Sequence, residues 1–265
     1  MTTPTENRLA VLIKQDNIQS RFKEVLGART PAFISSVLSA YNGNAALKEA
    51  EPMSVISSAM IAATLDLPIN PSLGFAHIVP YSGKAQFQMG WKGFVQLAMR
   101  TGQYKTMNCS GVFDGELVKH NRITGDIEID TAKKTSDKVI GYVAYFRLIS
   151  GFEKYLYMTT EEVTAHGKKY SASYKKGGGR WAEDFEAMAL KTVIKMLLSK
   201  WGILSVEMQK AMVADQGVFE AIDAEPVYTD NAETEKKTTP ATGKTSRLKN
   251  AVTGQAATPA GDGLI

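Results

Sequence analysis

Basic and amide side chains dominate the stretch from Lys84 to Lys105, and no acidic residue lies between these two lysines. Ammonium, guanidinium and amide groups donate hydrogen bonds to phosphate oxygens without reading a base sequence. Lys92, Gln96 and Arg100 are spaced at i, i+4 and i+8, so a helix would place them on one face. The residues predicted to contact phosphates in this stretch are Lys84, Gln86, Gln88, Lys92, Gln96, Arg100 and Lys105. The alternative interpretation is an ordinary solvated helix face.

A second basic stretch runs from Gly167 to Lys200, where eight bases outnumber three acids and give a net charge of +5. Tyr170, Tyr174 and Trp181 lie among these bases. Aromatic rings interleaved with cations suit a single-stranded nucleic acid, because bases stack on rings while cations follow the phosphates. The residues predicted to bind DNA here are Lys168, Lys169, Lys175, Lys176, Arg180, Trp181, Lys191 and Lys195.

Within this second stretch, the first four lysines are expected to form a mobile basic flap, because Gly177-Gly178-Gly179 leaves the backbone free to order on a ligand. Lys191 and Lys195 are expected on a helix face separate from the apolar stripe. Trp91, from the first stretch, joins Trp181 as a candidate for stacking on DNA. Either tryptophan could instead brace the DNA-binding groove, core packing is the further alternative for Trp181, and a solvated face is the alternative for the two lysines.

The sequence lacks the residue spacing of nucleotide-binding and metal-binding motifs. Gly177-Gly178-Gly179 lacks the spacing of a dinucleotide-binding turn, and Gly243-Lys244-Thr245 resembles the end of a phosphate-binding loop but has Thr238 where that loop needs glycine. The three histidines are scattered, without the spacing of metal ligands. We therefore predict no catalytic residue, no metal and no cofactor. A metal-dependent nuclease stays open as a minor alternative, because Asp126, Glu128 and Asp130 alternate along an expected strand, where they more simply face solvent.

The composition is that of a globular protein: 265 residues, of which 44% are hydrophobic and 22% charged, with a formal net charge of +4. Cys109 is the one cysteine, which excludes an intrachain disulfide and fits a reducing compartment. The thiol is expected to be a small buried group of a strand. No apolar run approaches the roughly 20 residues that span a bilayer. We expect a cytoplasmic protein with no membrane partner.

The order of expected elements predicts an α+β fold, with a central antiparallel sheet that includes a β-hairpin, packed helices, an N-terminal helical segment and a disordered C-terminal tail. The hairpin is expected over residues 74–89, with Pro80 at an edge or bulge, and a helix over 91–100. Strands dominate residues 104–158. Thr159 and Glu162 form a capping box that opens a further helix, and long helices are expected over 181–200 and 205–214.

Three regions follow from composition. Residues 1–48 are predicted to be an N-terminal helical segment, residues 49–220 a folded core, and residues 221–265 a flexible tail with a possible partner-binding role. Charge is divided near the boundary of the last region: residues 214–235 hold seven acids and no base, and residues 236–250 hold five bases and no acid. The tail is expected to be dispensable for DNA binding.

The motifs of this chain resemble those of the RecT family of phage single-strand annealing proteins over roughly residues 50 to 215. They occur in the family's order, and the sequence carries them as Leu65-Asp66-Leu67, Leu73 to Tyr81, Gly90-Trp91-Lys92-Gly93, Ala98 to Gln103, Trp181, Met188 to Thr192, and Lys195. One departure is Asp66, where the family pattern has glycine.

This resemblance implies a protein that binds single-stranded DNA and pairs it with a complementary strand without ATP, during phage homologous recombination. It implies assembly into a ring or helical filament, with residues 1–48 as the oligomerisation segment and residues 49–220 as the DNA-annealing core. As partners it implies single-stranded and annealed duplex DNA, a phage exonuclease and the single-strand binding protein of the bacterial host cell. The lack of a nucleotide motif agrees with an ATP-free mechanism, and no side chain is expected to perform bond chemistry. A passive single-stranded nucleic-acid-binding protein is the other class that the basic residues allow.

Overall fold

The N-terminal part of the chain is helical in the computed structural model, which describes residues 8–228. Its elements are α1 (Arg8–Leu12), α2 (Asp16–Leu26), a 3-10 turn (Gly27–Arg29), α3 (Thr30–Asn42), α4 (Ala45–Lys48) and α5 (Pro52–Thr64). The thin apolar stripe of the first helices, with Leu9, Ile13 and Phe22, is buried within the chain, and α1 and α2 contact α5. These apolar residues are therefore covered by the chain's own core, and the predicted oligomer contact of this segment would have to use other side chains.

The predicted hairpin is present and belongs to a three-stranded antiparallel sheet in the order β1-β2-β8. Its strands are β1 (Ala76–Tyr81), β2 (Lys84–Met89) and the short β8 (Gly217–Val218). Ser82 and Gly83 both have positive φ, which is the backbone that a two-residue hairpin turn requires. Pro80 lies on β1, at the edge of the sheet, where its missing N–H is tolerated.

Helix α6 (Trp91–Arg100) follows β2 directly and has the bounds expected from the sequence. Two glycines make this junction possible. A Cβ on Gly90 would lie 2.1 Å from the carbonyl oxygen of Gly74, and one on Gly93 would lie 2.3 Å from that of Phe75. The motif Gly90-Trp91-Lys92-Gly93 therefore lets α6 begin against the backbone that leads into β1.

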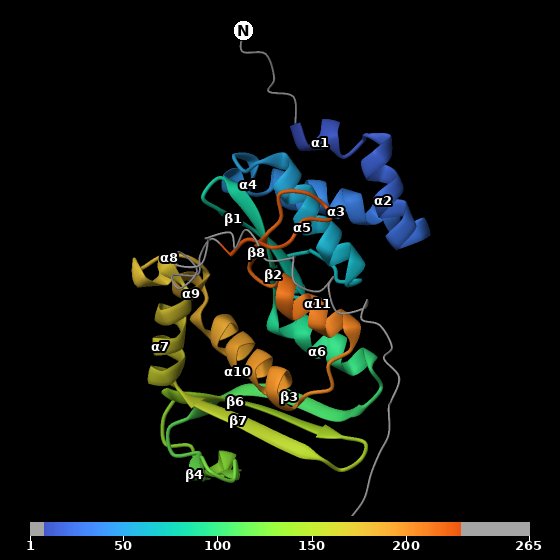
Figure 1. The fold of residues 1–265 in the computed structure, drawn as a ribbon. Coiled ribbons are helices and arrows are strands. Elements are labelled where there is room, and N and C mark those ends of the chain that lie inside the picture. The colour runs from blue at the N-terminus through green and yellow to red at the C-terminus, as the bar shows by residue number, and fades with distance from the viewer. Residues whose placement is uncertain (1–7, 229–265) are drawn as a thin grey trace, which may run out of the picture.

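A second antiparallel sheet has the order β3-β6-β7 and forms the opposite end of the molecule from α1–α5 (Figure 1). Its strands are β3 (Tyr104–Phe113), β6 (Val139–Leu148) and β7 (Glu153–Thr159). A small hairpin, β4 (Leu117–His120) with β5 (Ile127–Ile129), and a 3-10 turn (Thr131–Lys133) interrupt it between β3 and β6. Cys109 on β3 is buried, as expected, and burial raises the pKa of its thiol to about 12.

The remaining helices are α7 (Thr160–Tyr170), α8 (Ala172–Lys175), α9 (Arg180–Glu183), α10 (Phe185–Trp201) and α11 (Val206–Ala214). The capping box of Thr159 and Glu162 is present. The helix expected over 181–200 is interrupted at Asp184, whose φ of −149° is not helical and whose side chain accepts a hydrogen bond from the Ala187 N–H. The segment expected to form a mobile basic flap is partly helical, because α7 extends to Tyr170 and α8 follows at once.

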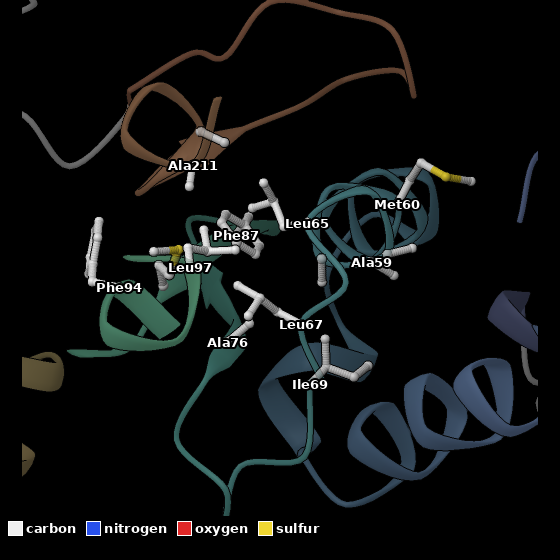
Figure 2. Close-up of a cluster of buried hydrophobic side chains, with 14 of the residues drawn as sticks. Ala59, Met60, Leu65, Leu67, Ile69, Ala76, Phe87, Phe94, Leu97 and Ala211 are labelled. Atoms are coloured by element: carbon white, nitrogen blue, oxygen red, sulfur yellow. The ribbon is translucent and has the colours of Figure 1, made fainter. Parts of the chain in front are cut away.

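One continuous hydrophobic core joins the two sheets. Phe87, Phe94, Leu97 and Ala211 gather with Leu65, Leu67 and Ile69 between α5, β2, α6 and α11 (Figure 2). Helix α10 crosses the middle of the molecule and contacts α6 on one side and β3, β6 and β7 on the other (Figure 1). The α+β class and the antiparallel pairing are confirmed, but the expected central sheet is divided into separate sheets linked by helices.

Candidate nucleic-acid interface

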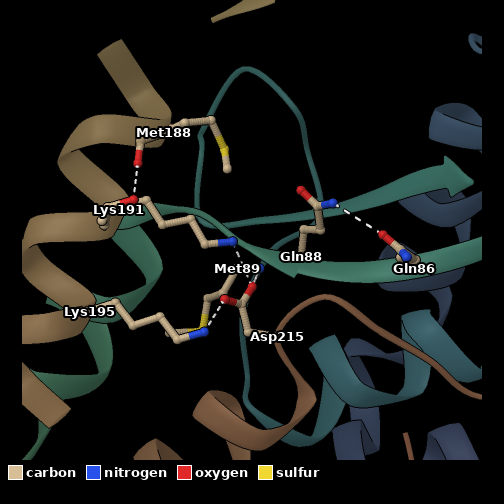
Figure 3. Close-up of polar contacts among 8 residues, drawn as sticks. Gln86, Gln88, Met89, Met188, Lys191, Lys195 and Asp215 are labelled. Carbon is tan, nitrogen blue, oxygen red and sulfur yellow. Dashed lines mark hydrogen bonds and ion pairs between the residues drawn. The ribbon is translucent and has the colours of Figure 1, made fainter. Parts of the chain in front are cut away.

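The two basic stretches meet at a buried carboxylate. Asp215, just after α11, accepts hydrogen bonds from Lys191 Nζ on Oδ1 and from Lys195 Nζ on Oδ2, each at 2.7 Å (Figure 3). Its Oδ1 also accepts one from the Met89 N–H at 3.0 Å, at the residue before Gly90. Asp215 thus connects α10 to the junction of β2 and α6.

Burial divides the roles within this cluster. The Asp215 side chain is fully buried, that of Lys191 is 6% exposed and that of Lys195 is 32% exposed. Burial alone would raise the pKa of Asp215, but the positive charges of Lys191 and Lys195 outweigh it and lower the pKa to about 2. Lys191 is therefore a buried partner of an ionised carboxylate, and Lys195 is the member of the cluster that also faces the surface.

Sequence reasoning missed Asp215 as a site residue and assigned it to the acid-rich segment after residue 214. Two lysines four residues apart on a mainly apolar helix were the available signal, because a buried ammonium needs an acidic partner. The acid lies 20 residues beyond Lys195, so its pairing could not be found from local spacing.

Two further predicted phosphate ligands are engaged within the chain. Lys84 pairs with Glu220 at 2.6 Å, and this hydrogen bond raises the pKa of Lys84. Arg100 donates to the carbonyl oxygens of Leu65 at 2.8 Å and Asp66 at 2.7 Å, so it holds the chain where α5 ends.

Asp66 has a left-handed backbone with φ of 51°, which explains why the family pattern has glycine there. Asp tolerates this conformation better than most residues, and here its carboxylate also pairs with Arg29 and Arg100. The departure from the pattern therefore keeps the local turn.

The other predicted cations are displayed on the surface or near it. Exposed lysines from the predicted set are Lys92, Lys105, Lys168, Lys169, Lys175 and Lys176. Arg180 is half-buried and pairs with Glu183 at 3.2 Å. The lysines of α7 and α8 lie beside α9, so the predicted flap and Arg180 occupy one side of the molecule (Figure 1). Lys84 and Lys105 lie on other elements, at the β1–β2 turn and the start of β3.

The aromatic and amide candidates differ in burial. Trp181 is 6% exposed, stacks on Tyr174 at a centroid distance of 5.4 Å and packs over Gly167, so its environment is that of a core residue. Trp91 is partly exposed, with Lys92 Nζ 5.7 Å from its ring centroid. Gln86 is buried and accepts a hydrogen bond from Gln88. The partly exposed residues among the candidates are therefore Trp91, Gln88 and Gln96.

A cleft of about 810 Å³ lies between α3–α4 on one wall and β1 with α9 on the other. Arg180 and His77 line it, opposite the hydroxyl groups of Ser35, Ser36 and Ser39. Burial, followed by the charges of Arg180 and Lys191, lowers the pKa of His77 to about 4, so its ring is neutral at physiological pH. Glu183 also lines the cleft and pairs with Arg180, so this wall combines an Arg–Glu ion pair with neutral hydrogen-bonding groups.

Residues 8–228 contain neither a cluster of metal-ligating side chains nor a membrane-spanning helix. No group of three or more His, Cys, Asp or Glu side chains is placed to hold a metal ion among these residues. No helix in the same part of the chain is long and apolar enough to cross a membrane.

Residues 31–240 match the model of the RecT family. The chain belongs to the RecT family. It is 56% identical over 212 residues to the uncharacterized protein YqaK of Bacillus subtilis (strain 168), covering 80% of this chain and 73% of YqaK. It is 26% identical over 232 residues to the protein RecT of Escherichia coli (strain K12), covering 79% of this chain and 84% of that protein.

Membership of the RecT family implies single-stranded DNA binding and strand annealing. Annealing proteins of this family generally perform no bond chemistry. The RecT-family match spans both basic stretches, the hairpin and the Asp215 cluster. The individual DNA contacts of these residues stay predictions.

Proposed function

We propose that this protein binds single-stranded DNA and anneals it to a complementary strand without ATP, acting as an oligomer in phage recombination. The observation that carries the proposal is the RecT-family match across residues 31–240, which contains every predicted DNA-binding residue. The partners of this activity would be a phage exonuclease and the host's single-strand binding protein.

The displayed cations support a phosphate-binding surface. Lys92 at the start of α6, Arg180 at the start of α9 and the exposed lysines of α7 and α8 are predicted phosphate ligands that reach the surface. A strand held by its phosphates along such a surface leaves its base edges free to test a complementary strand. Neutralisation of both backbones is the requirement for annealing, because two polyanions repel each other.

The 810 Å³ cleft beside β1 is the site that we propose for part of the strand. Arg180 supplies a positive charge that a phosphate would share with Glu183, and the hydroxyls of Ser35 and Ser39 on α3 supply neutral hydrogen-bonding groups on the facing wall. Such groups contact phosphate and sugar without base discrimination, which is what annealing of any sequence demands. An oligomer would extend the path from one subunit to the next.

Annealing is tested by mixing two complementary fluorescent oligonucleotides with the protein in the absence of ATP and following their pairing. We expect pairing faster than the spontaneous rate, whereas a non-complementary pair should show no signal. Light scattering of the same mixture should report an assembly larger than one chain. Binding of either strand without accelerated pairing would contradict annealing and leave a passive single-strand binder.

A further inference from the structure

The chain after α11 runs back across the hairpin sheet as a strap, which we define as residues 215–228. Its Gly217 and Val218 pair with Phe87 and Gln86 on β2, and Val218 forms a bridge with Val227. Figure 1 shows this segment crossing from α11 toward the N-terminal helices. All charged residues of the strap are acidic.

The acids of the strap pair with bases from three separate elements. Asp215 holds Lys191 and Lys195 of α10, and Glu220 pairs with Lys84 of β2 at 2.6 Å. Asp223 accepts two hydrogen bonds from Arg21 of α2, at 2.6 and 3.2 Å. Lys84, Lys191 and Lys195 are bases that we predict to bind DNA phosphates. In this structure the carboxylates of the strap are bound to these ammonium groups instead.

These ion pairs differ in how readily the carboxylate can be replaced by another anion. Asp215 is fully buried and fixed by three hydrogen bonds, so it belongs to the core. The side chains of Glu220 and Asp223 are 64% and 69% exposed, and their partners Lys84 and Arg21 are 37% and 50% exposed. Exposed pairs contribute about 0–1 kcal/mol and weaken with salt. A phosphate backbone that approaches Lys84 or Arg21 can therefore displace the carboxylate.

We propose that Glu220, in the exposed part of the strap, is an electrostatic autoinhibitory contact that competes with DNA phosphates for Lys84. The inference rests on the proposed single-stranded DNA binding. In the DNA-free protein the Glu220 carboxylate occupies Lys84, and in the complex a phosphate takes its place. The strap thereby lowers the affinity for single strands at low salt and has less effect as salt rises.

The test measures binding of a fluorescent oligothymidylate to the full chain as a function of salt. Glu220→Gln should bind about two- to fivefold more tightly than the wild type at low salt, as the loss of one exposed competing pair implies. The matched control is Glu128→Gln, which removes the same charge from an exposed residue of β5. The affinities of Glu220→Gln and the wild type should converge at high salt.

A double-mutant cycle assigns the effect to Lys84. In a Lys84→Ala background, Glu220→Gln should change the affinity no more than Glu128→Gln does, because its competing cation is gone. Equal effects of Glu220→Gln and Glu128→Gln in the wild-type background would overturn the strap proposal while DNA binding stood. Failure of the wild type to bind the oligonucleotide would instead overturn the proposed function. Unchanged thermal midpoints would show that each variant is folded.

Discussion

Asp215 determines what Lys191 and Lys195 present to the surface. Helix periodicity separates these lysines from the apolar stripe, and on an isolated helix both would be solvated. Helix α10 is instead enclosed by α6, the β3-β6-β7 sheet and the chain after α11, which removes Lys191 from water. A single carboxylate then satisfies both ammonium groups.

Removal of the Asp215 carboxylate should destabilise the fold strongly. We expect Asp215→Ala to lower the free energy of unfolding by about 3–5 kcal/mol, because it leaves a buried ammonium without its partner. Urea unfolding at neutral pH measures the change. Asp223→Ala is the matched control, because Asp223 is also ion-paired but is 69% exposed, and it should cost at most about 1 kcal/mol. Similar losses for the two variants would contradict the role given to burial.

The lowered pKa of Asp215 predicts that the free energy of unfolding decreases at acid pH. The folded-state pKa of Asp215 is about 2, below the ordinary aspartate value of 3.8, so the ionised group stabilises the folded state above pH about 4. That contribution, about 2–3 kcal/mol for a shift of this size, is lost as pH falls from about 4 toward 2. Unfolding free energies of the wild type and Asp215→Asn should therefore converge over this range. A difference that stays constant down to pH 2 would exclude the predicted shift.

The position of helix α6 depends on Gly90 and Gly93, which have no side chain, as much as on its apolar face. Gly93→Ala would place a Cβ 2.3 Å from the backbone oxygen of Phe75, so the helix must move away from β1. We expect a loss of about 1–3 kcal/mol in unfolding free energy, measured by urea denaturation. Gly178→Ala is the control, since its nearest new contact is at 3.9 Å, and it should be close to neutral. Equal effects would mean that the close approach is unimportant.

The segment from α7 to α9 carries the predicted flap, and its adjacent lysines can be tested as a pair. Lys175→Ala/Lys176→Ala should weaken single-stranded DNA binding and reduce the slope of log affinity against log salt by about 1.4, the value for two phosphate contacts. Titrations with an oligothymidylate at several salt concentrations measure both. Lys133→Ala/Lys134→Ala removes the same charge beside β5 and should leave the slope unchanged. An unchanged slope for the flap variant would remove these two lysines from the interface.

At the scale of the whole molecule, the contacts of the strap indicate that the chain can be shortened to residue 228 but not to residue 220 without loss of stability. The predicted tail of residues 221–265 includes residues 221–228, which the structure describes, while residues 229–265 lie outside the described part. Asp223 pairs with Arg21, Val227 forms the bridge to Val218, and the Tyr228 hydroxyl donates to the Val213 carbonyl. These contacts join the end of the strap to α2, β8 and α11.

A protein ending at Tyr228 should therefore keep the thermal midpoint of the full chain and anneal naked complementary strands. One ending at Glu220 should unfold at a lower temperature, because it loses the contacts of residues 221–228. Thermal unfolding and the annealing assay on both shortened proteins check this. Loss of annealing in the protein that ends at Tyr228, with its midpoint unchanged, would show that residues beyond 228 take part in the activity.

The local elements follow from residues close together in the chain. The Ser82-Gly83 turn, the bounds of α6, the capping box of Thr159 and the edge position of Pro80 all depend on backbone and side-chain preferences within a few residues. The family could be recognised for the same reason, since its motifs are short stretches such as Gly90-Trp91-Lys92-Gly93. Hydrophobic spacing was sufficient for the α+β class.

By itself, then, the sequence determined most of the elements, the α+β class, the family and which residues carry positive charge. The tertiary structure alone decided which of those charges are buried or engaged within the chain. Lys191 is buried by packing around α10, Lys84 is paired by an acid 136 residues away, and Arg100 is bound to the chain after α5. Each outcome depends on contacts between segments distant in sequence, and neither helical period nor charge counts contain that information.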